Sequence, residues 1–251
     1  MNQAPPTEQA PGTERPKPSW IEGPEGSPAT SASWGPGSVL VGVGLLILLV
    51  MIAGTVVLVV EGDADTLAGR LSLQAALALA MIVVAFLAAT PNLRLASPRQ
   101  LGLGPALDAP IRSAARAYLV YIACAIVLSV LLSPEQEDVT RELGWGEGAL
   151  ANVLAAFLII VAAPVSEEIF FRGFMFAGIR ARAGFATAAL ISGGIWGLVH
   201  WTGADSWPVV LQLAVFGVIL AWLYERTGSI RPAIAVHAVN NALAFLVLTA
   251  G

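Results

Sequence analysis

The chain has 251 residues, of which 57% are hydrophobic and only 12% are charged, and its mean hydropathy is +0.76. Soluble domains carry about 25% charged residues, and about 20 consecutive apolar residues span a bilayer. The composition therefore excludes an ordinary soluble domain and predicts an all-α fold, a polytopic transmembrane helical bundle of about seven or eight spans. The net charge of −4, without a basic cluster, argues against a nucleic-acid partner. The single cysteine, Cys124, excludes an intrachain disulfide and any cysteine-based zinc motif.

The amino-terminal stretch differs from the rest of the chain. Residues 1–36 are rich in proline, glycine and serine and show no apolar periodicity. Such a segment cannot bury enough apolar surface to offset the entropy lost on ordering. We therefore expect a disordered cytoplasmic tail over 1–36 and a transmembrane helical domain over 37–251.

Seven apolar runs follow, and we expect each to cross the membrane as a helix. They cover residues 39–60, 71–89, 117–132, 149 to about 178, 185–201, 207–224 and 232–249. The fourth run would be about 45 Å long, and Pro164 within it predicts a kink. An eighth span would need a break at Pro164 or the entry of the basic segment 91–116 into the membrane. That segment is also a candidate for a short interfacial helix.

The arginines divide unevenly between alternate connections. One set holds Arg94, Arg99, Arg112, Arg116, Arg180, Arg182, Arg226 and Arg231, and the other holds only Arg70 and Arg141. Cytoplasmic connections of membrane proteins carry the excess of arginine and lysine. We therefore expect a multi-pass protein of the cell membrane with its amino terminus in the cytoplasm and its carboxyl terminus outside.

The fourth run contains charged residues that are costly in a membrane. Glu167, Glu168 and Arg172 lie within six positions of an otherwise apolar stretch, and one charge at the bilayer centre costs about 2.5–3.5 kcal/mol on insertion scales. Glu168 and Arg172 are four positions apart and share a helix face, whereas Glu167 points about 100° away. This spacing predicts a pair of Glu168 with Arg172 and leaves Glu167 to face a cavity.

Both histidines of the chain lie in late apolar runs. Trp196 precedes His200 by four positions, and Asn241 follows His237 by four, so each pair shares a helix face. Asn240 is three positions after His237, and the spacing does not decide which of the two amides faces the same way. A second pattern, Gly193 with Gly197, allows another helix to approach closely.

Together these residues resemble three motifs of a known family. Glu167-Glu168-x-x-x-Arg172 resembles its Glu-Glu-x-x-x-Arg motif, residues 196–200 resemble Phe-x-x-x-His with Trp in place of Phe, and residues 237–241 resemble His-x-x-x-Asn. The family is the CAAX-processing and bacteriocin-processing intramembrane proteases, also called CPBP or Abi, and the likeness is to the type II CAAX prenyl protease. The matching region is a motif core at about 149–245.

The resemblance implies an intramembrane endopeptidase that hydrolyses membrane-associated, prenylated or other peptide substrates. Glu167 is the candidate general base for a water molecule, and Asn241 is the candidate donor to the oxyanion. Glu168 with Arg172 is an orienting pair, although Glu168 could also share the role of base. The candidate catalytic residues are Glu167, Glu168, Arg172, His200, His237 and Asn241.

The residues leave open whether a metal ion takes part in the reaction. Glu167, His200 and His237 form a candidate zinc set, a two-histidine, one-carboxylate arrangement with an open position, and a probable metalloprotease is therefore expected. The same histidines could instead hold the water for a glutamate base without metal. No His-Glu-x-x-His motif of the common zinc proteases occurs.

Two other function classes use the same residues. A transporter or channel would use them as a proton or ion relay, although the chain halves show no obvious repeat. A non-catalytic immunity or scaffold protein would instead bind a membrane partner. The resemblance implies a membrane-associated peptide or protein as substrate, and the apolar composition implies the lipid bilayer as surroundings. Neither the identity of the substrate nor the oligomeric state follows from the sequence.

Overall fold

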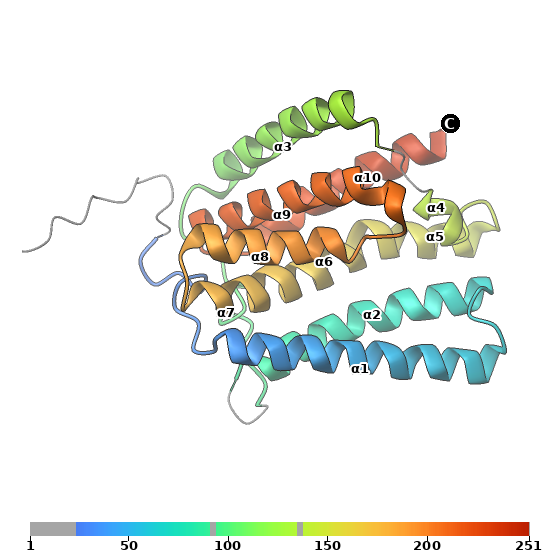
Figure 1. The fold of residues 1–251 in the computed structure, drawn as a ribbon, viewed down its shortest axis with the longest axis horizontal. Helices are drawn as coiled ribbons and strands as arrows, with labels where there is room; N and C mark the ends of the chain where they lie inside the picture. Colours follow the sequence, from blue (N-terminus) through green and yellow to red (C-terminus); the bar gives the residue numbers. More distant parts are fainter. Residues whose placement is uncertain (1–23, 91–93, 135–137, 251) are drawn as a thin grey trace, which may run out of the picture.

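A computed structural model describes residues 24–90, 94–134 and 138–250. Helices make up all the regular structure of these residues, and no strand occurs among them (Figure 1). Within these described ranges, six helical runs are long and apolar enough to cross a membrane. The predicted all-α, multi-pass fold is confirmed.

The long helices extend slightly beyond the apolar runs. They are α1 (Pro36–Glu61), α2 (Leu67–Ala88), α3 (Pro110–Leu132), α9 (Trp207–Thr227) and α10 (Arg231–Ala250). Proline stands in the first turn of α1, α3 and α9, where its missing N–H has no partner to lose. Gly62 and Gly228 end α1 and α9 in the left-handed conformation that glycine adopts without strain. A short helix, α4 (Val139–Glu142), lies between α3 and α5.

The fourth run is one continuous helical path with two wide turns. Its parts are α5 (Ala149–Phe157), the π-helix η2 (Leu158–Ala162), α6 (Ala163–Glu167), the π-helix η3 (Glu168–Phe176) and α7 (Ala177–Arg180). The break considered at Pro164 does not occur, because the chain widens into a π turn just before the proline and keeps right-handed helical dihedrals. The described part of the basic connection, 94–109, forms turns and not the short helix we considered. Neither route to an eighth span is present in the described residues.

The fifth run is shorter than expected. α8 (Phe185–Leu198) has 14 residues, which is about 21 Å of helix and less than the ~30 Å hydrocarbon core. The expected span over 185–201 therefore ends early, and a non-helical stretch with a short 3₁₀ turn, η4 (Ala204–Ser206), leads into α9. His200 follows this early end and is partly buried.

Glycine brings α8 and α9 into close contact. A Cβ atom on Gly193 would lie 2.9 Å from the backbone nitrogen of Val218, and one on Gly197 would lie 2.5 Å from the backbone oxygen of Val210. Real Cβ atoms do not approach backbone atoms this closely, so only glycine permits this helix separation. The predicted close approach of another helix at this glycine pair is confirmed.

Residues 24–35 pack against the bundle. Ala29 and Trp34 are buried, and the Trp34 indole nitrogen donates a hydrogen bond of 2.9 Å to the backbone oxygen of Phe174. Gly178 makes room for the ring, because a Cβ there would lie 2.6 Å from Trp34 Cδ1. The prediction of disorder to residue 36 is therefore wrong for 24–35, where the buried indole offsets the ordering entropy. Residues 1–23 of that prediction lie outside the described residues.

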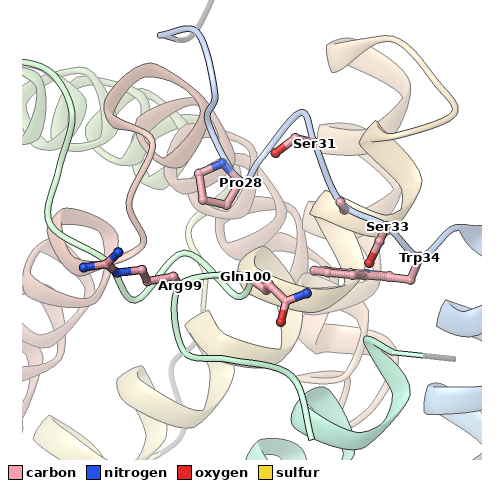
Figure 2. A pocket seen from close by; sticks show the side chains of 7 residues that line it. Pro28, Ser31, Ser33, Trp34, Arg99 and Gln100 are labelled. Atoms are coloured by element: carbon pink, nitrogen blue, oxygen red, sulfur yellow. The ribbon is translucent and has the colours of Figure 1, made fainter. Parts of the chain in front are cut away.

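A small cavity borders this packed segment. It has a volume of about 220 Å³, and Pro28, Trp34 and Gln100 are among the residues that line it (Figure 2). The cavity lies between the segment before α1 and the connection from α2 to α3. Neither Glu167 nor His237 lines it.

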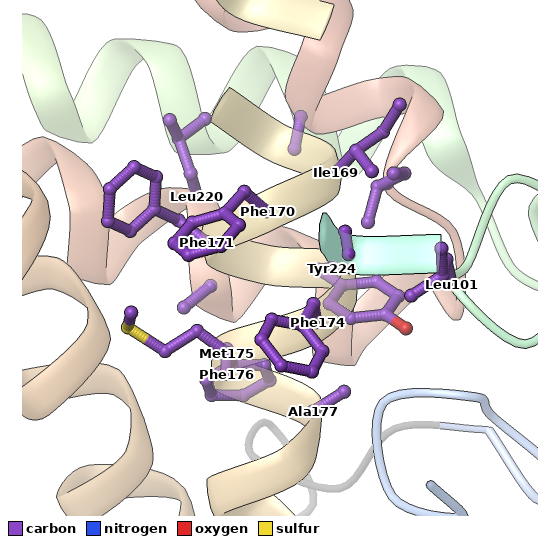
Figure 3. Packing of buried hydrophobic residues seen from close by; sticks show 14 of the residues in the cluster. Leu101, Ile169, Phe170, Phe171, Phe174, Met175, Phe176, Ala177, Leu220 and Tyr224 are labelled. Carbon is purple, nitrogen blue, oxygen red and sulfur yellow. The ribbon is translucent and has the colours of Figure 1, made fainter. Parts of the chain in front are cut away.

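The second half of the fourth run is buried on every side. Five successive or near-successive apolar side chains of η3 fill the core: Phe170, Phe171, Phe174, Met175 and Phe176 (Figure 3). Gly173 lies against the connection before α3, since a Cβ there would be 2.6 Å from the backbone oxygen of Leu101. This packing removes Glu168 and Arg172 from lipid as well as from water.

Candidate active site

Glu168 is the centre of a buried ion-pair network. Arg172 Nη1 donates to Glu168 Oε1 over 2.9 Å, and both side chains have no exposed surface. The same Oε1 lies 3.0 Å from His237 Nδ1 on α10. The pair of Glu168 with Arg172 predicted from helical spacing is confirmed, and His237 joins it from another helix.

Glu167 has different surroundings. Trp196 Nε1 on α8 donates to Glu167 Oε2 over 2.6 Å, and His237 Nε2 lies 3.9 Å from the same oxygen. The Glu167 side chain keeps 14% of its surface exposed, whereas Glu168 keeps none. The two adjacent glutamates are therefore distinct, and Glu167 is the one that a substrate or water can reach.

His237 stands between the two carboxylates. A neutral imidazole has one donor and one acceptor nitrogen, and the contact of Nδ1 with a carboxylate assigns the proton to Nδ1. Nε2 is then an acceptor that faces Glu167. The 3.9 Å between Nε2 and Glu167 Oε2 is too long for a direct hydrogen bond and suits a bridging water molecule.

His200 is less closely involved. Its Nδ1 lies 2.8 Å from the backbone oxygen of Trp196, four residues earlier on α8. The Trp196 ring stands edge-on to both histidines, with ring centroids 5.4 Å from His200 and 5.2 Å from His237. The structure thus brings His200 to the site, where the Trp196 indole lies beside the imidazoles of both histidines.

The candidate zinc ligands do not form a metal site as they lie. Among the residues that the structure describes, no three histidine, cysteine, aspartate or glutamate side chains are grouped so that they could hold a metal ion. Glu167 and His237 approach each other, but His200 does not complete the set. The proposed set does not fit a metal ion in this arrangement, and zinc binding stays a prediction.

Asn241 contacts the wide turn before Pro164. In η2 the backbone nitrogen of Ala163 bonds to the oxygen of Leu158, five residues back, so the Ile159 oxygen would next meet the nitrogen of Pro164. Proline has no N–H, and Asn241 Nδ2 donates to the Ile159 oxygen instead, over 3.0 Å. Asn241 is therefore the asparagine that faces the fourth run. One of its two amide protons remains for a further acceptor.

Several contributors to the site were missed by sequence reasoning. The Arg172 guanidinium lies 4.6 Å from the centre of the Trp196 ring, a cation–π contact. A Cβ on Gly217 of α9 would lie 3.2 Å from Arg172 Nη2, so this glycine makes room for the charge. Arg172 Nε and Nη2 and Glu168 Oε2 are buried without a hydrogen-bond partner. A basic side chain beside a glycine on another helix is not a pattern that one sequence shows.

The comparisons with known proteins agree with the motifs. Residues 149–243 match the family model described as "Type II CAAX prenyl endopeptidase Rce1-like". All six candidate catalytic residues lie within this segment. The resemblance stated from the motifs is therefore confirmed for that segment, which is similar to the type II CAAX prenyl endopeptidases.

Curated relatives match over a similar length. "Uncharacterized protein YyaK" of Bacillus subtilis is 34% identical over 39% of this chain and 34% of its own length. "Putative membrane peptidase YdiL" of the same organism is 37% identical over 37% of this chain and 38% of its own length. The chain thus matches little more than a third of these two relatives. No solved structure matches the chain significantly.

Proposed function

We propose that the chain is an intramembrane endopeptidase in which Glu167 activates water. The observation that carries the proposal is the placement of His237, which contacts Glu168 through Nδ1 and faces the partly exposed Glu167 through Nε2. A buried glutamate–arginine pair that orients a histidine toward a second, accessible glutamate is an arrangement for handling one water molecule. The Rce1-like domain over residues 149–243 supports the same reaction class.

The proposed reaction is ordinary amide hydrolysis. Glu167 takes a proton from the water held between its carboxylate and His237 Nε2, and the hydroxide oxygen bonds to the substrate carbonyl carbon. The free amide proton of Asn241 donates to the oxyanion of the tetrahedral intermediate. The carbon–nitrogen bond then breaks, and Glu167 passes its proton to the departing amine. Each proton and bond is thereby accounted for.

Glu168 and Arg172 act as an orienting pair in this proposal. Neither side chain has exposed surface, so neither touches a substrate. Their role is to hold His237 in one tautomer and one orientation, as carboxylates do for histidines in other hydrolytic sites. His200, anchored by the Trp196 backbone, borders the same space.

The substrate we propose is a peptide or protein at the membrane, with prenylated carboxyl termini as the first class to test. We also propose that the protein resides in the cell membrane with its amino terminus in the cytoplasm. In support, residues 24–35 and the connections α2–α3, α7–α8 and α9–α10 lie at one end of the bundle (Figure 1), and these connections with their adjoining helix ends carry the eight arginines. The accessible Glu167 lies nearer this end of the 149–180 run.

The decisive experiment compares Glu167→Gln with Glu147→Gln in purified protein reconstituted into liposomes. Glu147 is about half exposed and lies before α5, so its variant is the matched control. Cleavage of a fluorogenic prenylated peptide library should be lost in Glu167→Gln, by at least ~1,000-fold, and kept in the control. Cleavage at the normal rate by Glu167→Gln contradicts the proposal.

Two further measurements separate the rival functions. Proton or ion flux through the same liposomes that changes in Glu167→Gln, without any peptide cleavage by the parent protein, would indicate a relay instead of a peptidase. Zinc content of the purified protein, with cleavage measured before and after chelation, tests the zinc prediction.

A further inference from the structure

The indole of Trp196 is placed to do more than fill space. Its side chain is only 1% exposed, and its Nε1 donates to Glu167 Oε2 at 2.6 Å. The centroid of the Phe216 ring lies 5.9 Å from the centroid of the Trp196 ring. Packing therefore fixes the indole independently of its hydrogen bond to the carboxylate.

Among the aromatic residues, only tryptophan combines a bicyclic ring with an N–H that can donate to Glu167 from this position. The indole has one N–H donor and no acceptor, phenylalanine has no donor, and the tyrosine hydroxyl extends along the ring axis. At this position the resembling family motif has phenylalanine, so the contact depends on the exchange that this chain carries. A hydrogen bond from a neutral donor to a carboxylate is also stronger than one between neutral groups.

Glu167 depends on this bond for a fixed position. Among the described residues, the indole is the one group within direct hydrogen-bond distance of its carboxylate, since His237 Nε2 is 3.9 Å away. A glutamate side chain has three rotatable bonds and, when partly exposed, adopts several rotamers. Without the indole, the carboxylate would lose the contact that sets its direction toward His237.

We propose that Trp196 is a positioning residue that holds the general base Glu167 in the rotamer facing His237. The inference rests on the proposed function for its effect on rate, but the contact itself is independent of any activity. Trp196 also lies edge-on to His237 and supplies the backbone oxygen for His200. One residue thus contacts Glu167, His237 and His200.

The test replaces the donor and keeps the aromatic ring. Trp196→Phe should lower kcat by at least about 10-fold, the loss expected for a hydrogen bond to a charged group, while KM changes less than about two-fold. Trp34→Phe is the matched control, because it removes another buried indole donor, bonded to the Phe174 backbone. The control should keep kcat within about two-fold of the parent.

A spectroscopic measurement makes the inference independent of catalysis. The indole ¹⁵N–¹H signal that disappears in Trp196→Phe should move in Glu167→Gln, because the charged acceptor is lost, and stay in place in Glu147→Gln. If Trp196→Phe does not fold, 3-benzothienylalanine at position 196 removes the N–H while it keeps the bicyclic shape.

The two proposals fail in different ways. An unmoved indole signal in Glu167→Gln, or a normal kcat without the N–H, overturns the role of Trp196. Full cleavage by Glu167→Gln, with the indole signal moved as expected, overturns the role of Glu167 as base but leaves the contact established.

Discussion

Gly197→Ala tests how closely α8 must lie to α9. The new Cβ would stand 2.5 Å from the backbone oxygen of Val210 and 2.8 Å from the backbone nitrogen of Ala214, where ordinary contacts begin near 3.4 Å. Backbone atoms cannot rotate away, so the helices must separate by roughly 1 Å, and overpacking of this kind costs about 1–3 kcal/mol. His200, which follows the end of α8, would shift with it.

Gly194→Ala is the matched control on the same helix. A Cβ there meets nothing within 4 Å, yet it gains the same helix propensity, about 1 kcal/mol. The difference between the two variants therefore isolates the steric term, and it corresponds to an apparent Tm lower by about 2–12 °C in Gly197→Ala. Thermal unfolding in detergent, followed by tryptophan fluorescence, measures it. Equal Tm values for the two variants would refute a close packing of α8 on α9.

Two further variants probe the site. Asn241→Ala should lower the free energy of unfolding by about 1–3 kcal/mol, because the Ile159 oxygen loses the hydrogen bond from Asn241 Nδ2, while Asn240→Ala should stay within about 0.5 kcal/mol. Chemical unfolding of both in mixed micelles checks this, and equal losses would contradict it. Arg172→Met should cost about 3–5 kcal/mol, because it leaves Glu168 buried without its cation. A normal unfolding midpoint for Arg172→Met would contradict a stabilising role for this ion pair.

The predictions that succeeded depend on local spacing. Glu168 and Arg172 meet because positions four apart share a helix face. This geometry depends on one segment alone and can be predicted without knowing the tertiary packing. The long apolar runs gave the helices for the same reason, since length and composition alone decide whether a segment can span hydrocarbon. The glycine pair on α8 likewise predicted that another helix packs closely, but it did not identify that helix as α9.

The parts that the sequence left open or predicted wrongly depend on how distant segments pack. A π turn before Pro164 changes which carbonyl is left free, so the partner of Asn241 became clear only with the helix register. The indole of Trp196 was interpreted as an aromatic of a motif, although its N–H direction depends on the rotation of α8 against η3. Burial of Trp34 offsets the entropy of a segment whose composition alone predicts disorder.

The anchoring of Trp34 has a practical consequence for handling the protein. Bulk added just before α1 would displace the Trp34 indole, which packs beside Gly178 and bonds to the Phe174 backbone. Affinity handles and surface attachments should therefore be placed away from residues 24–35. A handle fused directly at Ser33 would disturb the packing of this segment on the bundle.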